Sequence, residues 1–255
     1  MFYKLFAARW VAICVAGALS ACGLLPSDSE HLSSAEKAAL NVQMGVRYME
    51  MGMLETAEQK LEAAYRLDSH NPEILNALAI FYERVKNYER AEEFYQAAVR
   101  EDPDNYSIKN NYGRLLCERG QVAEGMALLE VALDSPMNQR TWLALSNVGI
   151  CYLGQNDVVQ GESYLRRALQ ANPEYSPALQ AMMKLSYNNG QYMSARAFLE
   201  RYQSVAKHSA ETLWFAFQIE RALGNQSAAE HYKEQLLTLF PTSKQAQAAA
   251  SDINK

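Results

Sequence analysis

The side chains best suited to chemistry in this sequence are four histidines and four cysteines. The histidines are His31, His70, His208 and His231, and their spacing does not match H-E-x-x-H or another metal-binding motif. The sequence also has no G-x-S-x-G elbow, phosphate-binding loop or dinucleotide fingerprint. The pairs Glu92-Glu93 and Asp102/Asp104 have the pattern of solvated helix and turn charges. We therefore expect no enzyme activity, metal or cofactor, and attention moves to the cysteines.

The first informative cysteine, Cys22, comes shortly after a strongly apolar segment near the start of the chain. Lys4 and Arg9 form a short basic region, and residues 10–19 are apolar. This run is shorter than the ~20 residues that span a bilayer, but it matches the apolar region of a secretory signal peptide. The motif LSAC, residues 19–22, resembles a bacterial lipobox. That resemblance implies that Cys22 becomes the first mature residue and carries acyl chains.

The lipobox predicts where the protein resides. Two or more acyl chains hold a protein almost permanently at a membrane. Gly23 follows the cysteine, whereas lipoproteins retained in the inner membrane typically carry aspartate there, so the resemblance implies the periplasmic face of the outer membrane. We expect a signal peptide over residues 1–21 and an acylated tether over residues 22–32. The alternative is an ordinary signal peptide, or a buried helix, with an incidental cysteine.

Net charge argues against one class of partner. Loss of Lys4 and Arg9 with the signal peptide changes the formal net charge from −5 to −7. An acidic chain without a basic cluster is a poor candidate for nucleic-acid binding. The sequence also has no second apolar stretch long enough to cross a membrane.

The rest of the chain is a repeat array. Units begin at Ala38, Pro72, Tyr106, Trp142, Ser176 and Ala210, with steps of 34, 34, 36, 34 and 34 residues. A small residue recurs at one place in all six units, where two helices must approach closely: Ala57, Ala91, Gly125, Gly161, Ala195 and Ala229. Turn-forming residues separate the paired helices of five units: Gly52, Gly120, Asn156, Gly190 and Gly224.

This period and pattern resemble the tetratricopeptide repeat. The resemblance implies an all-α fold, a right-handed superhelical solenoid of six repeats over residues 33–255, ending in a capping helix near 243–253. Glu220 and Lys233 occupy normally apolar sites of the sixth repeat, as expected where an outer face meets water. Such solenoids present a curved surface to a peptide or folded partner, and no small-molecule substrate is expected.

Two cysteines remain inside the array. Cys117 and Cys151 lie near the ends of the first helices of repeats three and four. Their two-residue offset turns the side chain by ~200°, so one can face forward while the other faces back. A disulfide across the repeat interface is therefore plausible in an oxidising compartment. The alternative is a pair of small buried thiols.

The inner groove is the candidate partner site. In tetratricopeptide repeats its lining comes mainly from positions 2, 5, 9 and 12 of each first helix. The candidate residues are apolar at the start of the array: Ala39, Val42, Val46, Met49 and Ile80. Polar residues follow in later repeats, so we expect an apolar segment of a partner to bind near repeat one. The alternative is that the tether folds back over these residues.

Three stretches carry a closer resemblance: NNYGRLLCERG at 110–120, NVGICYLGQND at 147–157, and ALGNQSAAEHYKEQLLTLFPTS at 222–243. They resemble the outer-membrane lipoproteins of type IV pilus systems, the pilotin or pilus-stability lipoproteins. The resemblance implies binding to secretin subunits, help in their localisation and multimerisation in the outer membrane, and support of pilus assembly and twitching motility. The alternative function is a structural adaptor of another envelope complex, such as outer-membrane protein insertion or cell-wall machinery.

Overall fold

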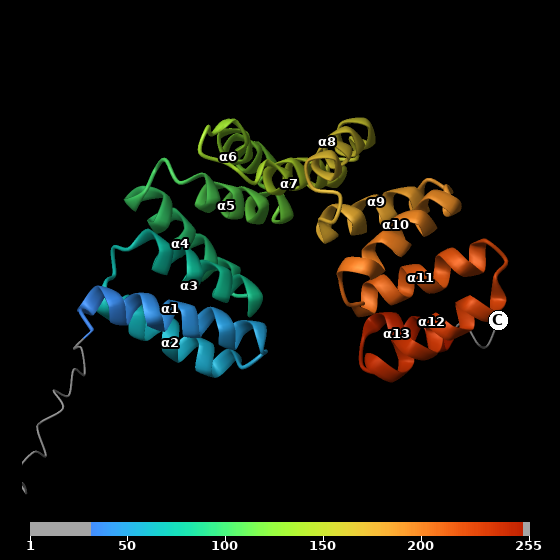
Figure 1. The fold of residues 1–255 in the computed structure, drawn as a ribbon, viewed down its shortest axis with the longest axis horizontal. Helices are drawn as coiled ribbons and strands as arrows, with labels where there is room; N and C mark the ends of the chain where they lie inside the picture. The colour runs from blue at the N-terminus through green and yellow to red at the C-terminus, as the bar shows by residue number, and fades with distance from the viewer. Residues whose placement is uncertain (1–31, 252–255) are drawn as a thin grey trace, which may run out of the picture.

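The computed structural model describes residues 32–251, which form a curved array of helices without a strand in that range (Figure 1). The expected all-α solenoid is therefore confirmed. The signal peptide, Cys22 and nearly all of the predicted tether lie outside the described residues.

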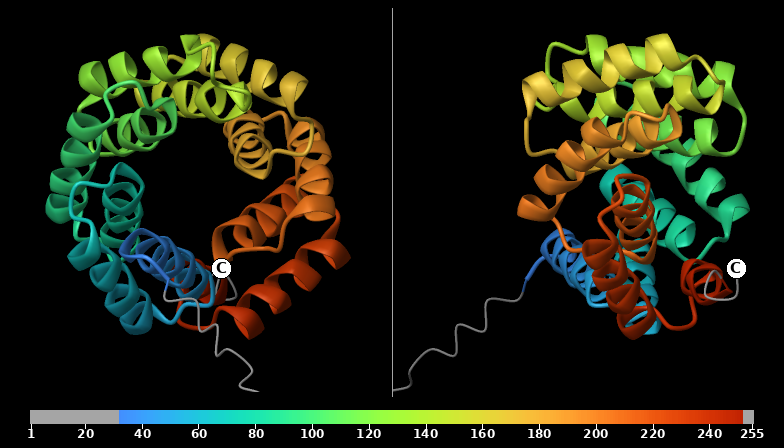
Figure 2. Two further views of the ribbon diagram at one scale, coloured as in Figure 1. Left: turned by 60° about the vertical axis from the view of Figure 1, so that its left-hand side comes forward. Right: turned by 90° about the vertical axis from the view of Figure 1, so that its right-hand side faces the viewer.

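Six helical hairpins and one final helix make up the array. Their bounds are α1 Ser34–Glu50, α2 Leu54–Leu67, α3 Pro72–Arg84, α4 Tyr88–Glu101, α5 Tyr106–Glu118, α6 Val122–Asp134, α7 Thr141–Gly154, α8 Val158–Ala171, α9 Ser176–Asn188, α10 Tyr192–Val205, α11 Ala210–Ala222, α12 Gln226–Leu239 and α13 Lys244–Ser251. The first helix of each hairpin lies toward the inside of the curve and the second on the outside (Figure 2, left).

Small residues bring the two helices of each hairpin together. The six small residues expected at one point of each second helix are all buried. The closest approach is in repeat three, where a Cβ atom built on Gly113 would lie 2.7 Å from the backbone oxygen of Gly125. A Cβ atom on Gly125 would meet the backbone oxygen of Gly113 at the same distance. Any larger residue at either position would therefore push α5 and α6 apart.

Each turn for which a positive φ is recorded places one residue in the left-handed backbone conformation. Gly52, Gly120, Gly190 and Gly224 have φ between 72° and 86°. Asn156 has a φ of 62°, and asparagine tolerates this conformation better than most residues. In repeat two the residue is Lys86, also with a φ of 62°. The sequence pattern did not reveal this turn, because lysine carries no turn signal.

One connection between repeats differs from the others. Four residues link α2 to α3, α4 to α5, α8 to α9 and α10 to α11, whereas six, residues 135–140, link α6 to α7. The long linker is fixed by Asn138, whose side chain is buried. Its amide donates to the backbone oxygen of Ala132 at 2.8 Å, and its Oδ1 accepts from the backbone N–H of Arg140 at 2.9 Å. The 36-residue spacing therefore corresponds to an ordered linker.

The expectation that the charged residues of the sixth repeat meet water is wrong, because Glu220 and Lys233 are both buried. Glu220 is 3% exposed, and its carboxylate accepts from Asn225 at 2.9 Å and lies 3.2 Å from Nε of Arg196. Lys233 is also buried. Helix α13 packs on α11 and α12, with Ala246 buried. The expected final helix is thus present as far as the described residues reach.

Candidate partner-binding surface

The ninth residue of each repeat, counted from the repeat starts given above (Ala38 in repeat one), lies on the inner wall of the array. In order these residues are Val46, Ile80, Arg114, Ile150, Lys184 and Gln218. The series begins with two aliphatic side chains and then alternates with polar ones. An apolar segment of a partner would therefore find its most favourable surface at the N-terminal end of the wall.

Four of the five predicted binding residues have side chains that a partner can reach. Ala39 and Val46 are exposed, Val46 by 37%, and Val42 and Ile80 are half-buried. The expectation that Met49 is accessible is wrong: it is only 4% exposed and belongs to the main hydrophobic core. Its side chain reaches the core cluster to which α2 and α3 also contribute, and burial of its apolar area is favourable there. The apolar surface of repeat one therefore consists of Ala39, Val42 and Val46, with Ile80 beside it in repeat two.

Other exposed apolar residues of repeat one were not predicted. Leu40 is 46% exposed, Met51 60% and Met53 44%. Leu40 is the third residue of repeat one, counted from Ala38. The equivalent residues of the next two repeats, Ile74 and Ile108, are only 2% exposed. In those repeats the preceding hairpin covers the position, whereas α1 has no preceding hairpin. The place of Leu40 at the start of the array was the sequence signal that could have identified it.

A charged cluster follows the apolar surface along the wall. Arg114 on α5 contacts the carboxylate of Glu83 on α3 at 2.7 Å, and its other terminal nitrogen contacts Glu118 at 2.9 Å. The hydroxyl of Tyr95 also donates to Glu83, at 3.2 Å. Burial and the nearby Glu83 carboxylate raise the pKa of Tyr95. Tyr95 therefore stays a neutral hydrogen-bond donor, and Glu83 joins repeats two and three.

Asparagine amides set the register of three successive first helices. Nδ2 of Asn111 on α5 donates to Oδ1 of Asn76 on α3 at 3.2 Å. Nδ2 of Asn147 on α7 donates to Oδ1 of Asn110 on α5 at 3.0 Å. In both contacts position six of one repeat donates to position five of the repeat before it. This shared geometry gives the wall a polar and well-defined centre.

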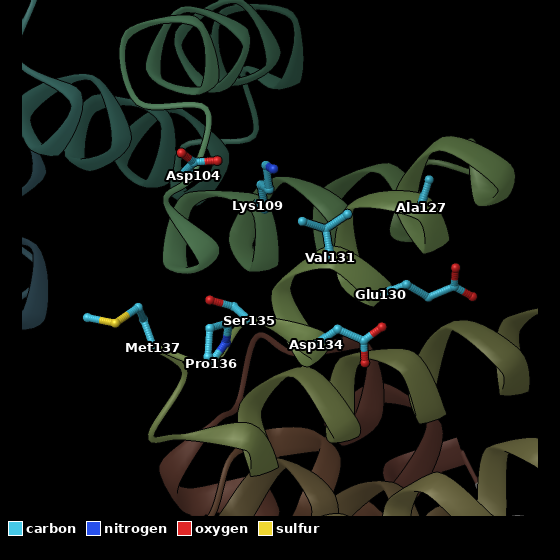
Figure 3. A pocket seen from close by; sticks show the side chains of 9 residues that line it. All are labelled: Asp104, Lys109, Ala127, Glu130, Val131, Asp134, Ser135, Pro136 and Met137. Carbon is cyan, nitrogen blue, oxygen red and sulfur yellow. The ribbon is translucent and has the colours of Figure 1, made fainter.

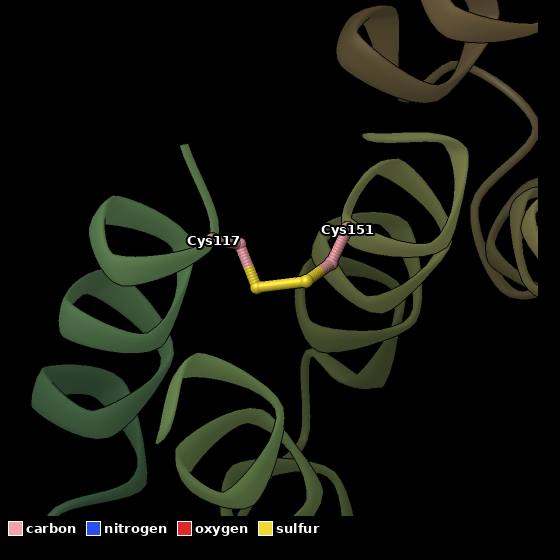
Figure 4. The surroundings of a disulfide bond; sticks show 2 residues. All are labelled: Cys117 and Cys151. Atoms are coloured by element: carbon pink, nitrogen blue, oxygen red, sulfur yellow. A yellow bond between two sulfur atoms is a disulfide. The ribbon is translucent and has the colours of Figure 1, made fainter. Parts of the chain in front are cut away.

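The two cysteines of the array meet at this wall. Cys117 and Cys151 are joined by a disulfide between α5 and α7, with a Cα–Cα distance of 5.5 Å (Figure 4). That separation lies within the usual range for a disulfide. The bond crosses the interface that the Asn110–Asn147 contact also spans, so repeats three and four are linked twice.

No group of three or more histidine, cysteine, aspartate or glutamate side chains within residues 32–251 is arranged to hold a metal ion. No helix in that range is both long enough and apolar enough to cross a membrane.

Comparison with known families agrees with the geometry of the array. Models described as tetratricopeptide repeats match residues 42–106, 84–147 and 152–212, which together are more than half of the chain. The chain belongs to the tetratricopeptide-repeat family. The matches cover hairpins of repeats one to five and end at the first residues of α11.

Two relatives within the tetratricopeptide-repeat family have been named for their role. The crystal structure of PilW, a widely conserved type IV pilus biogenesis factor, superposes with a TM-score of 0.69 at 32% sequence identity. The superposition covers 84% of this chain and 98% of that one. The type IV pilus assembly protein PilF of Pseudomonas aeruginosa is 26% identical over 207 residues, 81% of this chain and 82% of the relative. This tetratricopeptide-repeat protein is thus related to type IV pilus biogenesis factors.

A third comparison concerns the fold alone. A solved structure of P. aeruginosa PilF superposes with a TM-score of 0.66 at 23% identity, covering 86% of this chain and 99% of that one. The two molecules therefore share the fold over most of their length.

Proposed function

We propose that this protein is a lipid-anchored pilotin that binds secretin subunits and promotes their multimerisation in the outer membrane, supporting type IV pilus assembly and twitching motility. The observation that carries the proposal is the similarity to PilW, 32% identical over nearly the whole of that pilus biogenesis factor. The role in pilus assembly follows from the relatives. Secretin binding is the more specific part of the proposal and needs its own test.

The inner wall supports a binding function by its composition. Val42, Val46 and Ile80 leave aliphatic surface accessible beside a polar, hydrogen-bonded region. Burial of apolar area contributes ~25 cal/mol per Å², so a few such side chains supply a few kcal/mol before the costs of association. The protein acts as a scaffold in this proposal and carries out no reaction.

Acylation of Cys22 provides the location. A lipid at the start of the mature chain would hold the array at the periplasmic face of the outer membrane, where secretins assemble. Cys22→Ala should release the protein from outer-membrane fractions or leave it unprocessed. Fractionation of the variant with the outer membrane as completely as the wild type, in cells that lack the secretin, would contradict the lipid anchor.

Deletion of the gene tests the function itself. We expect cells without the protein to lose surface pili and the heat-stable secretin multimers, while secretin monomers remain. Unheated membranes blotted for secretin report the multimers, and electron microscopy reports the pili. Loss of pili with normal multimers would retain the role in pilus biogenesis and contradict the pilotin role. Normal pili and normal multimers would contradict both and favour another envelope complex.

A further inference from the structure

Repeat three departs from the other repeats in two ways, and both departures lie at one place on the outer side of the array. Its first helix carries Lys109 at the fourth position, where the four repeats numbered two, four, five and six have buried leucines: Leu75, Leu145, Leu179 and Leu213. Its connection to repeat four is the long linker 135–140. Figure 3 shows Lys109 and the linker residues Ser135 to Met137 around the same opening.

The opening is a cavity with a volume of about 680 Å³. We call it the outer groove and define it by Asp104, Lys109, Glu130, Val131, Asp134 and Met137, which line it together with smaller residues. The leucines at the equivalent position of the other four repeats are buried, whereas Lys109 is half-buried and lines the outer groove.

The outer groove exposes apolar side chains on a fixed support. Met137 is 72% exposed and Val131 50%. The neighbouring Asn138 is only 8% exposed and is hydrogen-bonded to the end of α6. The linker thus buries Asn138 and leaves the neighbouring Met137 exposed to water. Exposed apolar side chains on an ordered surface are typical of a contact site, since water does not favour them.

The charges of the outer groove select the kind of partner. Asp104, Glu130 and Asp134 give three negative charges and Lys109 gives one positive charge, so the lining has a formal net charge of −2. None of these four side chains forms an ion pair with another residue of the described range. Their carboxylates are therefore open to cations of a partner. An anionic lipid surface would be repelled by the same charges.

We propose that the outer groove binds a basic segment of a partner protein, with an apolar side chain of that segment inserted beside Val131 and Met137. Lysine or arginine residues of the segment pair with Glu130, Asp134 and Asp104. This surface is formed by α5, α6 and the linkers at either end of repeat three, and it shares no residue with the apolar surface of repeat one. The inference is therefore independent of secretin binding at repeat one, and either can fail without the other.

A pair of matched peptides tests this chemistry on the purified full-length protein. The probe is a fluorescent peptide of about twelve residues in which lysine and leucine alternate; the comparison peptide has glutamate in place of lysine. We expect the basic peptide to bind and its affinity to fall as salt rises from about 0.05 to 0.3 M. The acidic peptide should not bind.

Variants then assign the binding to the outer groove. Two double variants, Val131→Ser with Met137→Ser and Glu130→Gln with Asp134→Asn, should each lower the affinity for the basic peptide by about tenfold or more. Met193→Ser on α10 and Glu93→Gln on α4 change residues that are likewise exposed, and both variants should bind as the wild type does. All six substitutions in these four variants are at exposed positions, so circular dichroism should show normal folding.

Lys109→Leu tests the charge of the groove in the opposite direction. It removes the one positive charge of the lining and changes its formal net charge from −2 to −3. The basic peptide should therefore bind more tightly to this variant than to the wild type.

Three results would overturn the proposal. The first is equal affinity of the basic peptide for the wild type and both groove variants, or no binding up to about 1 mM. The second is weaker binding of the basic peptide by Lys109→Leu than by the wild type. The third is self-association of the wild type that Val131→Ser with Met137→Ser abolishes, since the occupant would then be a second copy of this chain.

Discussion

Asn147 on α7 donates a hydrogen bond to Oδ1 of Asn110 on α5 at 3.0 Å, and both side chains are buried. The preceding interface has the same contact between Asn111 and Asn76. The series stops at Ser146, the position-five residue of repeat four, because repeat five offers Ala181 where an asparagine donor would be needed. The hydroxyl of Ser146 is buried without a hydrogen-bond partner in the described range.

Neighbouring substitutions at the end of this series should have opposite effects. Asn147→Ala leaves Asn110 buried and unpaired, so it should lower the free energy of unfolding by ~1–3 kcal/mol. Ser146→Ala removes a buried polar atom that has no partner, so it should raise that free energy by about 1 kcal/mol. Urea unfolding followed by circular dichroism measures both. Destabilisation by Ser146→Ala would show that its hydroxyl has a partner in solution.

A glycine at position 86, in the left-handed turn of repeat two, should stabilise the folded protein. Lys86 is exposed and has a φ of 62°, a conformation that costs a residue with a Cβ atom ~1 kcal/mol. Lys86→Gly should therefore raise the free energy of unfolding by about 0.5–1 kcal/mol. Gly120→Ala, where φ is 86°, is the matched control and should lower it by a similar amount. A loss of stability in Lys86→Gly would contradict the assigned turn.

Acid should weaken the junction of repeats five and six through His208. Burial lowers the pKa of His208, whose ring contacts Thr212 at 3.1 Å and Gln203 at 3.2 Å. The unfolded chain therefore takes up this proton more readily than the folded protein. The contribution of His208 to stability is present above the unfolded pKa near 6.5 and falls as the pH decreases below it.

A substitution isolates this histidine from the other titrating groups. Melting temperatures of the wild type and His208→Gln should be measured between about pH 7.5 and pH 5.5. We expect the wild type to lose more stability over this range than the variant does. His70 titrates with the opposite sign, because the hydrogen bond to Glu101 raises its pKa, and it is present in both proteins. Parallel pH profiles would contradict the assignment to His208.

Oxidation of the cysteine pair should stabilise the array. Cys117 and Cys151 are 34 residues apart, and chain entropy suggests ~3–4 kcal/mol for a bridge of that span. Reductant should therefore lower the melting temperature of the wild type and leave the Cys117→Ser, Cys151→Ser protein unchanged. Thiol labelling of mature protein, unfolded without reductant, should detect neither cysteine. Two labelled thiols would show that the cysteines are free in the cell envelope.

The repeat register was predictable from the sequence because small and large residues recur at fixed positions. The same periodicity placed the close contact at Gly125. It failed where one side chain departs from the average environment of its position. Met49 occupies a groove position but packs into the core, and Lys86 occupies a turn position that glycine usually fills.

The candidate sites were predictable only in part, for a related reason. Periodicity identifies the wall to which a residue belongs, so Val46 and Ile80 could be assigned to the inner side. It does not identify cavities formed where two repeats meet. Lys109 and the long linker were each visible as irregularities, but only the folded chain shows that they border the same opening.

The most direct test of the account places a charge on the apolar surface of repeat one. Val46→Glu puts a carboxylate at a 37% exposed position, and Val159→Glu on α8, 79% exposed, is the control. Both variants should fold, with the free energy of unfolding within about 1 kcal/mol of the wild type. In unheated membranes blotted for secretin, we predict that multimers are absent with Val46→Glu and normal with Val159→Glu. Normal multimers and pili with a folded Val46→Glu protein would contradict binding at repeat one.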